Sequence, residues 1–215
     1  MEVSVKVYGH PMSTCTRKVL ATLAEKGHRA DLVLVDLMKG EHKQPEHLAR
    51  QPFGVIPVFE DDDGFQMYES RAIIRYLDAK LSGPSLTPSD LKARARMEQW
   101  INVEQSNFSP SVMKVVMEAM FAPMRGATPN QEVIQKGREG SAATLDVIEK
   151  ALAGGEYLAG AFSLAEIAWM PYLEYLAAAG GADLINDRPN VAAWWKRISE
   201  RPSWQLVTGK NKAAT

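Results

Sequence analysis

The sequence contains a single cysteine, Cys15, among its 215 residues. One cysteine cannot form a disulfide within the chain, which fits a reducing compartment and predicts a cytoplasmic protein. The chain also lacks a strong net charge, because 25 Lys and Arg stand against 26 Asp and Glu. We therefore expect no nucleic-acid-binding surface and no acidic tail.

Long apolar runs are missing as well. No stretch approaches the roughly 18 residues that a membrane helix needs, and the N-terminus lacks the pattern of a signal peptide, so no membrane contact is expected. The histidines lack metal-ligand spacing, and the acidic run at 61–63 before Gly64 is typical of a solvated hairpin tip. We therefore expect no metal.

Motifs for nucleotide binding and for serine hydrolases are absent too. The chain has no G-x-x-x-x-G-K-[ST], no G-x-G-x-x-G and no G-x-S-x-G. Hydrophobic residues nevertheless make up 46% and charged residues 24% of the chain, which is an ordinary globular composition. A chain of this length can bury a core in one or two domains.

The first 80 or so residues alternate strand and helix patterns. Strands are predicted at 3–8, 32–35, 55–60 and 65–68, and helices at 14–26 and 70–81. The polar segment 37–52 is predicted to be a loop with room for one helical turn. The order is strand, helix, strand, then a hairpin and a covering helix, which predicts a small α/β domain with its first two strands parallel.

Turn-forming residues at 82–85 mark a linker, and only helical patterns follow it. The predicted helices run from a cap at Ser89 or Asp90 to about Ala122 with a bend at Pro110, from a capping box at Thr128 to about Leu152, onward from a second capping box at 163–166, and, as the last helix, over 189–200. The second part of the chain is therefore predicted to be all-α.

Three places where the first domain passes into a helix or a strand are candidates for chemistry. In the segment 9–17, the hydroxyl of Ser13 would lie at a helix N-terminus beside backbone N–H groups. It could donate to a bound anion there. From this pattern alone, a plain helix cap is the simpler interpretation.

The second place is 54–58, where Pro57 interrupts a strand pattern. A cis bond after Ile56 would present the Ile56 backbone to an extended peptide ligand, although most such bonds are trans and an edge proline is the alternative. The third place is 68–71. There Ser70 opens a helix whose first N–H groups suit a carboxylate, while Glu69 suits an ammonium group, so the pair favours an α-amino-acid head group. Taken alone, Glu-Ser before an apolar run is more often only a cap.

These segments, in this order and ahead of a helical domain, resemble cytosolic glutathione S-transferases over essentially the whole chain. The sequence is most similar to the phi class, in Gly9-His10-Pro11-Met12-Ser13, Gly40-Glu41-His42-Lys43, Gln51-Pro52-Phe53-Gly54 with Pro57, Glu69-Ser70-Arg71-Ala72-Ile73, Phe162-Ser163-Leu164-Ala165-Glu166, and Arg188-Pro189-Asn190-Val191 with Trp194-Trp195. Each motif is weak by itself, but their order and spacing together are specific.

The resemblance implies a thioredoxin-like glutathione-binding domain over 1–82, an all-α domain with the hydrophobic substrate site over 89–215, and a homodimer. It implies that glutathione is a co-substrate and that its thiolate is conjugated to hydrophobic electrophiles without a metal. By resemblance, Ser13 is the catalytic hydroxyl. The implied glutathione-binding residues are His42 and Lys43 at the glycine carboxylate, Val55, Ile56 and Pro57 along the cysteinyl backbone, and Glu69 and Ser70 at the γ-glutamyl head group.

Methionines recur at helical spacing at 113, 117, 120 and 124. Core or subunit interface is the simpler interpretation of most of this stripe. The functional alternative is that Met117, together with Phe121 and Met12, lines a flexible pocket for the electrophile opposite Ser13.

The chain departs from the phi pattern at Val55, where a glutamine is common, at Glu166, where Asp is usual, and at Cys15. Some related classes use a cysteine in this loop to reduce mixed disulfides, and others use a tyrosine near the position of Tyr8 as the hydroxyl donor. Two alternative functions therefore stay open, a glutathione-dependent thiol-disulfide reductase that uses Cys15 and a non-catalytic binder of hydrophobic ligands.

Overall fold

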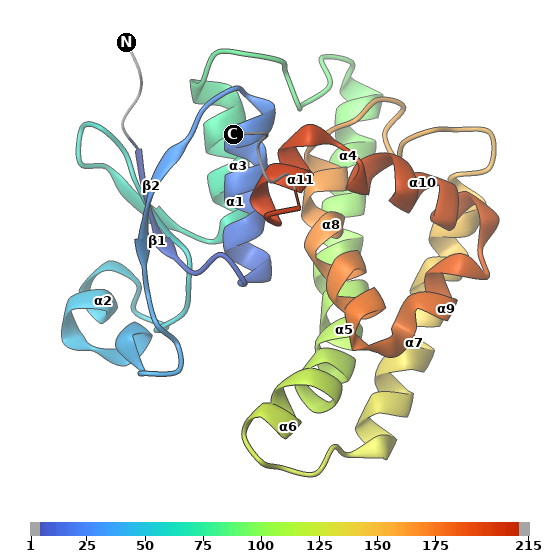
Figure 1. Ribbon diagram of the computed structural model, residues 1–215. Coiled ribbons are helices and arrows are strands. Elements are labelled where there is room, and N and C mark those ends of the chain that lie inside the picture. Colours follow the sequence, from blue (N-terminus) through green and yellow to red (C-terminus); the bar gives the residue numbers. More distant parts are fainter. Residues whose placement is uncertain (1–4, 211–215) are drawn as a thin grey trace. The chain divides into compact units, whose positions relative to one another are not determined.

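The computed structural model describes residues 5–210 of the chain. They form two compact units (Figure 1). Unit 1 comprises the residues up to Thr87 together with those from Arg201 onward, and unit 2 is Pro88–Glu200. The first predicted strand was expected to start at Val3, which lies outside the described residues.

Unit 1 is built on a four-stranded sheet in the order β2-β1-β3-β4. Its strands are β1 (Val5–Gly9), β2 (Ala30–Leu34), β3 (Val58–Glu60) and β4 (Gln66–Tyr68). β1 and β2 are parallel, whereas β3 is antiparallel to both β1 and β4. The predicted parallel pair followed by a hairpin is therefore confirmed.

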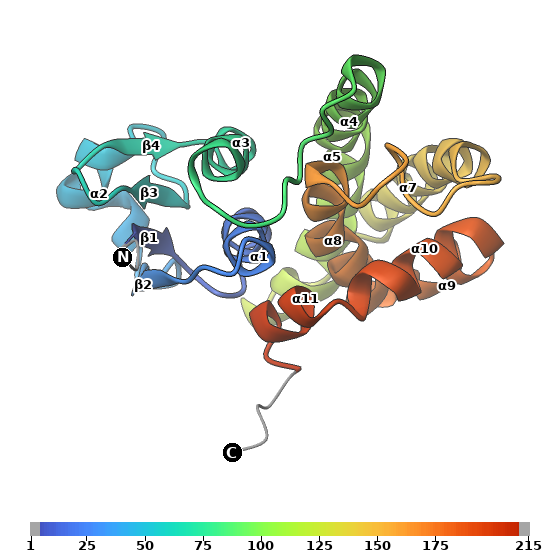
Figure 2. The ribbon, with the colours of Figure 1, turned by 90° about the horizontal axis from the view of Figure 1, so that it is seen from above.

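Helices cover both faces of this sheet. α1 (Thr14–Glu25) and α3 (Ser70–Lys80) lie on one face, and α2 (Pro45–Arg50) lies on the other (Figure 2). Alternation along β1 buries Val5 and Val7 and leaves Lys6 and Tyr8 on the opposite face.

The segment 37–52 contains two short helices, η1 (Glu41–Lys43) and α2, where the sequence predicted mostly loop. In the sequence Pro45 favours a loop, but it is the first residue of α2. Its missing N–H costs nothing at that position, because the first amides of a helix have no partner within the helix. The Ile56–Pro57 peptide bond is cis, and β3 begins only at Val58.

The predicted linker is held against unit 1. The buried ammonium of Lys26 donates to the carbonyl oxygen of Pro84 and to the carboxylate of Asp78, each at 3.0 Å. The same carboxylate accepts from the backbone N–H of Leu86 at 2.9 Å. These bonds tie the end of α1 and the end of α3 to the segment that leaves unit 1.

A further helix, α11 (Pro202–Val207), follows α10 (Pro189–Ser199), which the sequence analysis took as the last one. α11 packs against α1 with Trp204 fully buried, and Arg201 donates to both carboxylate oxygens of Glu25 at 2.6 and 2.7 Å. Residues 201–210 therefore cluster with unit 1, although the helical pattern of the sequence groups them with the preceding helices.

Unit 2 begins with a long helical run that Asp90 caps. Its carboxylate accepts from the N–H of Ala93 at 2.8 Å, which decides between the two expected caps. The run consists of α4 (Leu91–Val103), η2 (Glu104–Phe108), α5 (Ser109–Val116), η3 (Met117–Phe121) and α6 (Ala122–Met124). The π-helical turns η2 and η3 each end two residues before a proline, Pro110 or Pro123. A proline cannot donate to the carbonyl one turn earlier, so the hydrogen-bond ladder changes register there.

α7 (Gln131–Ala151) packs closely on α5. A Cβ on Gly137 would lie 2.8 Å from the carbonyl oxygen of Ser111, so only glycine permits this approach. Asn130 caps the helix by accepting from the N–H groups of Glu132 and Val133 at 3.0 and 3.2 Å. The capping box predicted at Thr128 is therefore wrong by two residues, and Pro129 precedes the helix.

α8 (Leu164–Leu176) is buried along almost its whole length and begins at the predicted capping box. The Ser163 hydroxyl accepts from the N–H of Ala165, and the Glu166 carboxylate accepts from the N–H of Ser163 at 2.9 Å and from the N–H of Leu158 at 2.8 Å. Burial raises the pKa of Glu166, although these hydrogen bonds oppose the shift. The next two helices, η4 (Ala177–Gly181) and α9 (Ala182–Asn186), were not predicted.

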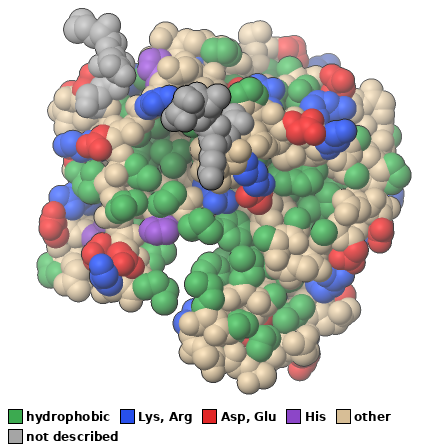
Figure 3. All heavy atoms as spheres, viewed as in Figure 1, with side chains coloured by type: hydrophobic (Ala, Val, Ile, Leu, Met, Phe, Trp, Pro, Cys, Tyr) green, Lys and Arg blue, Asp and Glu red, His purple; other side chains and the backbone are tan. Residues whose placement is uncertain are grey.

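Two further properties concern membrane-spanning helices and the distribution of surface charge. Within residues 5–210, none of the helices has the length and hydropathy needed to cross a membrane. On the face shown in Figure 3, basic and acidic side chains are interspersed, in keeping with the formal charge of −1.

Candidate active site

One end of the sheet in unit 1 gathers the segments that the sequence singled out. A row of paired residues, Val33, Tyr8, Val58 and Tyr68, crosses all four strands. β1, β2 and β4 end at this row or one residue beyond it, and β3 begins at it. The segments after β1, after β2, before β3 and after β4 therefore emerge at the same end. α1 and α3 also begin there.

Ser13 is the N-cap of α1. Its Oγ accepts from the backbone N–H of Thr16 at 3.2 Å, and its own N–H donates to the carbonyl oxygen of His10 at 2.9 Å. A hydroxyl that accepts one hydrogen bond can still donate its proton elsewhere. The cap and the anion-binding donor are thus compatible roles for the same side chain, at a helix end that attracts negative charge.

The other two candidates near the first strand differ in their surroundings. Cys15 is the second residue of α1 and is half-buried. Tyr8 donates to the carboxylate of Glu60 at 3.0 Å, and the guanidinium of Arg50 lies 4.6 Å from its ring centre. Burial, followed by the bond to Glu60, raises the pKa of Tyr8 above its ordinary value. A hydroxyl that already donates to a carboxylate is a poor stabiliser of a second anion.

The loop before β3 is fixed by bonds to its backbone. The buried ring of His47 bonds through Nε2 to the carbonyl oxygen of Val55 at 2.8 Å. The Gln51 side chain accepts from the N–H of Phe53 at 2.6 Å. Gly54 has a φ of +59°, a conformation that residues with a side chain rarely adopt, so glycine is favoured there. A Cβ would also lie 3.0 Å from the carbonyl oxygen of His42, which is a tight contact.

This loop places the three predicted residues differently. Val55 is 48% exposed, whereas Ile56 and Pro57 are buried. The strand pairs of β3 begin at Val58, which leaves the Ile56 backbone outside the hydrogen-bond ladder of the sheet. An extended ligand could pair with that backbone as an added strand.

His42 and Lys43 lie on η1. Burial lowers the pKa of the His42 imidazole, and the neighbouring Lys43 and His47 lower it further. Its buried Nδ1 has no hydrogen-bond partner among the described residues. Lys43 is exposed and donates to the carbonyl oxygen of Phe53 at 3.2 Å. The lowered pKa favours the neutral form of the imidazole, and Lys43 is the exposed basic side chain at this position.

Glu69 is the N-cap of α3 and has a φ of +72°. It is the one non-glycine residue with positive φ between residues 5 and 210. Such a conformation costs on the order of 1–3 kcal/mol and is typical of binding sites. Ser70 is the buried first residue of α3, and in the described chain no side chain caps that helix. The first amide N–H groups of α3 can therefore donate hydrogen bonds to an anionic ligand beside the exposed Glu69.

The three residues predicted to line the electrophile pocket lie on different units. Met12 belongs to unit 1 and is 54% exposed. Met117 and Phe121 belong to η3 in unit 2, where Met117 is 36% exposed and Phe121 is half-buried. Met113 and Met120 are half-buried, and Met124 is exposed. The methionine stripe is therefore not part of a closed core.

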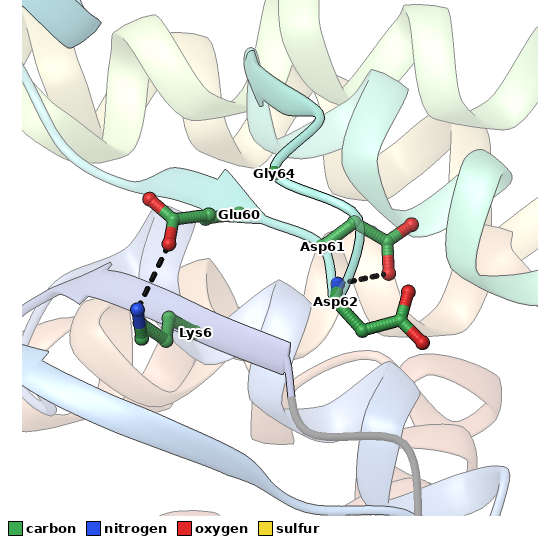
Figure 4. Close-up of a pocket in the computed structure, with 5 residues that line it drawn as sticks. All are labelled: Lys6, Glu60, Asp61, Asp62 and Gly64. Carbon is green, nitrogen blue, oxygen red and sulfur yellow. Dashed lines mark hydrogen bonds and ion pairs between the residues drawn. The ribbon is translucent and has the colours of Figure 1, made fainter.

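A separate hollow of about 320 Å³ lies at the other end of the sheet. It is lined by Lys6, Glu60, Asp61, Asp62 and Gly64 (Figure 4). Burial opposes ionisation of Asp61, but hydrogen bonds from Lys80 and Tyr76, each 2.5 Å, outweigh it and hold the pKa of Asp61 at about 2. Through these bonds Asp61 links the hairpin turn to α3.

Sequence motifs do not reveal the residues that hold these loops in place, among them His47 and Gln51. Each acts by bonding a backbone group of a nearby loop, His47 at Val55 and Gln51 at Phe53. No motif marks such contacts, because they depend on how the loop returns to the helix. The glycine at position 54 was the one local signal.

Comparison with known proteins gives consistent results. Residues 3–79 match the family model described as glutathione S-transferase, N-terminal domain, and residues 112–202 match glutathione S-transferase, C-terminal domain. Glutathione S-transferase F10 of Arabidopsis thaliana is 44% identical over 204 residues, which is 93% of this chain and 94% of that protein.

Solved structures agree with these matches. Glutathione transferase F7 from Populus trichocarpa has a TM-score of 0.91 and 42% identity, covering 95% of this chain and 98% of its own. Glutathione S-transferase I from maize, solved in complex with an atrazine glutathione conjugate, has a TM-score of 0.88 and 34% identity, covering 98% of this chain and 100% of its own.

Proposed function

We infer the function of this protein from its family: the chain belongs to the glutathione S-transferases, and its relatives place it in the phi class. It is therefore an enzyme with glutathione as co-substrate, built from a thioredoxin-like N-terminal domain and a helical C-terminal domain. We propose that it conjugates the glutathione thiolate to hydrophobic electrophiles. Ser13 carries this proposal, because its hydroxyl caps α1 at the sheet end where the other predicted glutathione contacts emerge.

The energy required is within reach of this arrangement. A free cysteine-type thiol has a pKa of about 8.5, so lowering it by about two units requires roughly 2.7 kcal/mol in favour of the thiolate. A charge-assisted hydrogen bond contributes about 1.5–3 kcal/mol, and a helix N-terminus adds to it. The thiol proton passes to solvent. The thiolate sulfur then bonds to the electrophilic carbon, and with an aryl halide the halide leaves.

The remaining contacts follow from the chemistry of glutathione. The first amides of α3 and Ser70 bind the γ-glutamyl carboxylate, and Glu69 binds its ammonium group. The Ile56 backbone, ahead of Pro57, pairs with the cysteinyl residue, with Val55 beside it. Lys43, aided by His42, binds the glycine carboxylate. In this proposal residues 1–82 bind glutathione, while 89–215 supply most of the electrophile site, with Met12, Met117 and Phe121 among its lining.

A turnover assay tests the proposal directly. Glutathione is offered with an aryl halide, an organic hydroperoxide or a mixed disulfide. Conjugation of the aryl halide supports the proposed function. Turnover of the mixed disulfide alone would favour a reductase that uses Cys15, and glutathione binding without any turnover would favour a non-catalytic binder. We place the enzyme in the cytoplasm, where a single cysteine stays reduced.

Removing a carboxylate partner should weaken glutathione binding. We expect Ser70→Ala and Lys43→Ala each to raise the glutathione Kd by about tenfold, because each removes one hydrogen bond to a charged group. The pKa of the bound thiol should stay unchanged. Calorimetric titration measures the affinity, with Ser85→Ala and Lys92→Ala as exposed controls that should bind normally. Wild-type affinity in both site variants would show that the contacts are misassigned.

Phe53 is the residue through which we propose that the chain forms a homodimer. The residue is 68% exposed, and its ring meets that of Tyr68 edge-on, with ring centres 6.1 Å apart. An exposed aromatic ring on a fixed loop suits insertion into a partner subunit. Phe53→Ala should shift sedimentation toward monomer, whereas Phe65→Ala, also exposed, should not. A dimer of undiminished strength in Phe53→Ala would rule out this contact.

A further inference from the structure

The loop that carries Ser13 has a second anchor, which no motif marks. Arg17 lies one turn into α1, and its N–H donates to the carbonyl oxygen of Ser13 at 2.9 Å. Its side chain turns back toward the start of the helix, as helical side chains do. Nε donates to the carbonyl oxygen of Pro11 at 2.8 Å, and Nη2 lies 3.5 Å from the sulfur of Met12.

Burial makes this guanidinium a fixed group. Arg17 is only 6% exposed, although arginine is rarely buried unless its donors are occupied. The planar guanidinium holds its N–H groups at fixed angles, so binding Pro11 orients it toward Met12 at the same time. A lysine ammonium would keep the charge but could not reproduce this two-point contact.

The residues that Arg17 touches immediately precede Ser13. Met12 is 54% exposed, so packing alone does not fix its side chain. On the helix side, the Ser13 hydroxyl is held by the N–H of Thr16 at 3.2 Å. On the loop side, the anchors are the bond from the Ser13 N–H to the carbonyl oxygen of His10 at 2.9 Å, the bond from Arg17 to Pro11, and the bond from the Met12 N–H to the His10 ring at 3.2 Å.

We propose that Arg17 is a positioning residue that sets the Ser13 hydroxyl through Pro11 and selects among electrophiles by holding the Met12 side chain. The inference rests on the proposed conjugation and deepens it. Misplacing a catalytic group by about 1 Å can cost on the order of 100-fold in rate. A group that holds both the hydroxyl loop and a lining residue therefore affects rate and substrate preference together.

The test compares Arg17→Lys and Arg17→Gln with Arg197→Lys, whose arginine donates to a backbone carbonyl of unit 2, that of Glu156, at 2.8 Å. Both Arg17 variants should lower kcat with an aryl halide by roughly 10- to 100-fold. They should also raise the pKa of bound glutathione, followed by ultraviolet thiolate absorbance, while the glutathione Kd stays unchanged. Arg197→Lys should match the wild type in kcat, in the pKa of bound glutathione and in the glutathione Kd. Wild-type kcat and thiol pKa in both Arg17 variants would overturn the proposal.

The Met12 contact has its own test. Met12→Leu removes the sulfur from an exposed side chain, so the variant should fold, and it should change the ratio of kcat/KM between a small and a bulky aryl halide. Arg17→Lys should change this ratio in the same direction, and the double variant should change it no further, because contacting residues are not additive. Additive changes would overturn the specificity role. If both Arg17 variants fail to fold, an unchanged ratio in Met12→Leu would overturn it as well.

These outcomes are separable from failure of the proposed function. A wild-type chain that binds glutathione but conjugates no aryl halide would refute the conjugation itself. The pKa of bound glutathione would then still report whether Arg17 positions Ser13. An unshifted pKa in Arg17→Lys and Arg17→Gln would refute the positioning role in that case too.

Discussion

Replacing Ser13 with alanine is expected to lower turnover with an aryl halide by about 10- to 1000-fold, the range seen when one preorganised donor is lost. The pKa of bound glutathione should rise at the same time, because the thiolate loses the hydroxyl that favours it over the thiol. Steady-state kinetics measures the first effect. The pH dependence of thiolate absorbance measures the second.

Two controls separate this effect from others. Ser13→Ala also removes the cap of α1, which costs about 1 kcal/mol of stability. Asp90→Ala removes the corresponding cap of α4 and should destabilise the protein to a similar degree without changing the thiol pKa. Cys15→Ala should leave conjugation nearly intact. The reverse result, with Cys15→Ala inactive and Ser13→Ala active, would move this protein to the thiol-disulfide reductases.

Among the variants proposed here, Glu166→Ala should lose the most stability, with the free energy of unfolding falling by about 3–5 kcal/mol. The carboxylate is fully buried and accepts from the N–H groups of Leu158 and Ser163 and from the Ser163 hydroxyl, at 2.8–2.9 Å. Alanine would leave all three donors buried without an acceptor. Urea unfolding followed by circular dichroism measures the change in the free energy of unfolding.

An exposed acid in a comparable position serves as the control. Glu132 lies in the first turn of α7 and pairs with Lys136 at 2.7 Å on the surface, so Glu132→Ala should cost no more than about 0.5 kcal/mol. Glu166→Asp keeps an acceptor and should lose less than Glu166→Ala. If Glu166→Ala were as stable as Glu132→Ala, the buried capping box would not be a major source of stability.

The fold was predictable wherever local chemistry and tertiary structure coincide. Alternation marked β1, and the capping box at Ser163 marked α8, because each signal is contained within a few residues. Prediction failed where one residue is compatible with two local structures. Pro45 reads as a loop or as the first residue of a helix, and only its packing decides between them. α11 was missed because its burial comes from α1, far away in the sequence.

In the candidate site, too, some residues could be predicted from the sequence and others could not. Its two proposed anion-binding positions, Ser13 and Ser70, were visible because each lies at the start of a helix. Their assignment to particular parts of glutathione came from resemblance to a family. The anchors of the loops could not be predicted, because Arg17 and His47 lie inside helices and act through backbone groups that only the folded loop brings within reach.

The return of α11 to unit 1 has a consequence for how the protein is made. The sheet and its helices leave the ribosome early, but α11, which packs against α1, and Arg201, which bonds to Glu25, emerge only after unit 2 has been translated. At ordinary elongation rates that interval is on the order of ten seconds. During it, α1 lacks the helix that packs against it in the folded protein. The first domain therefore cannot complete its native packing until unit 2 has been translated.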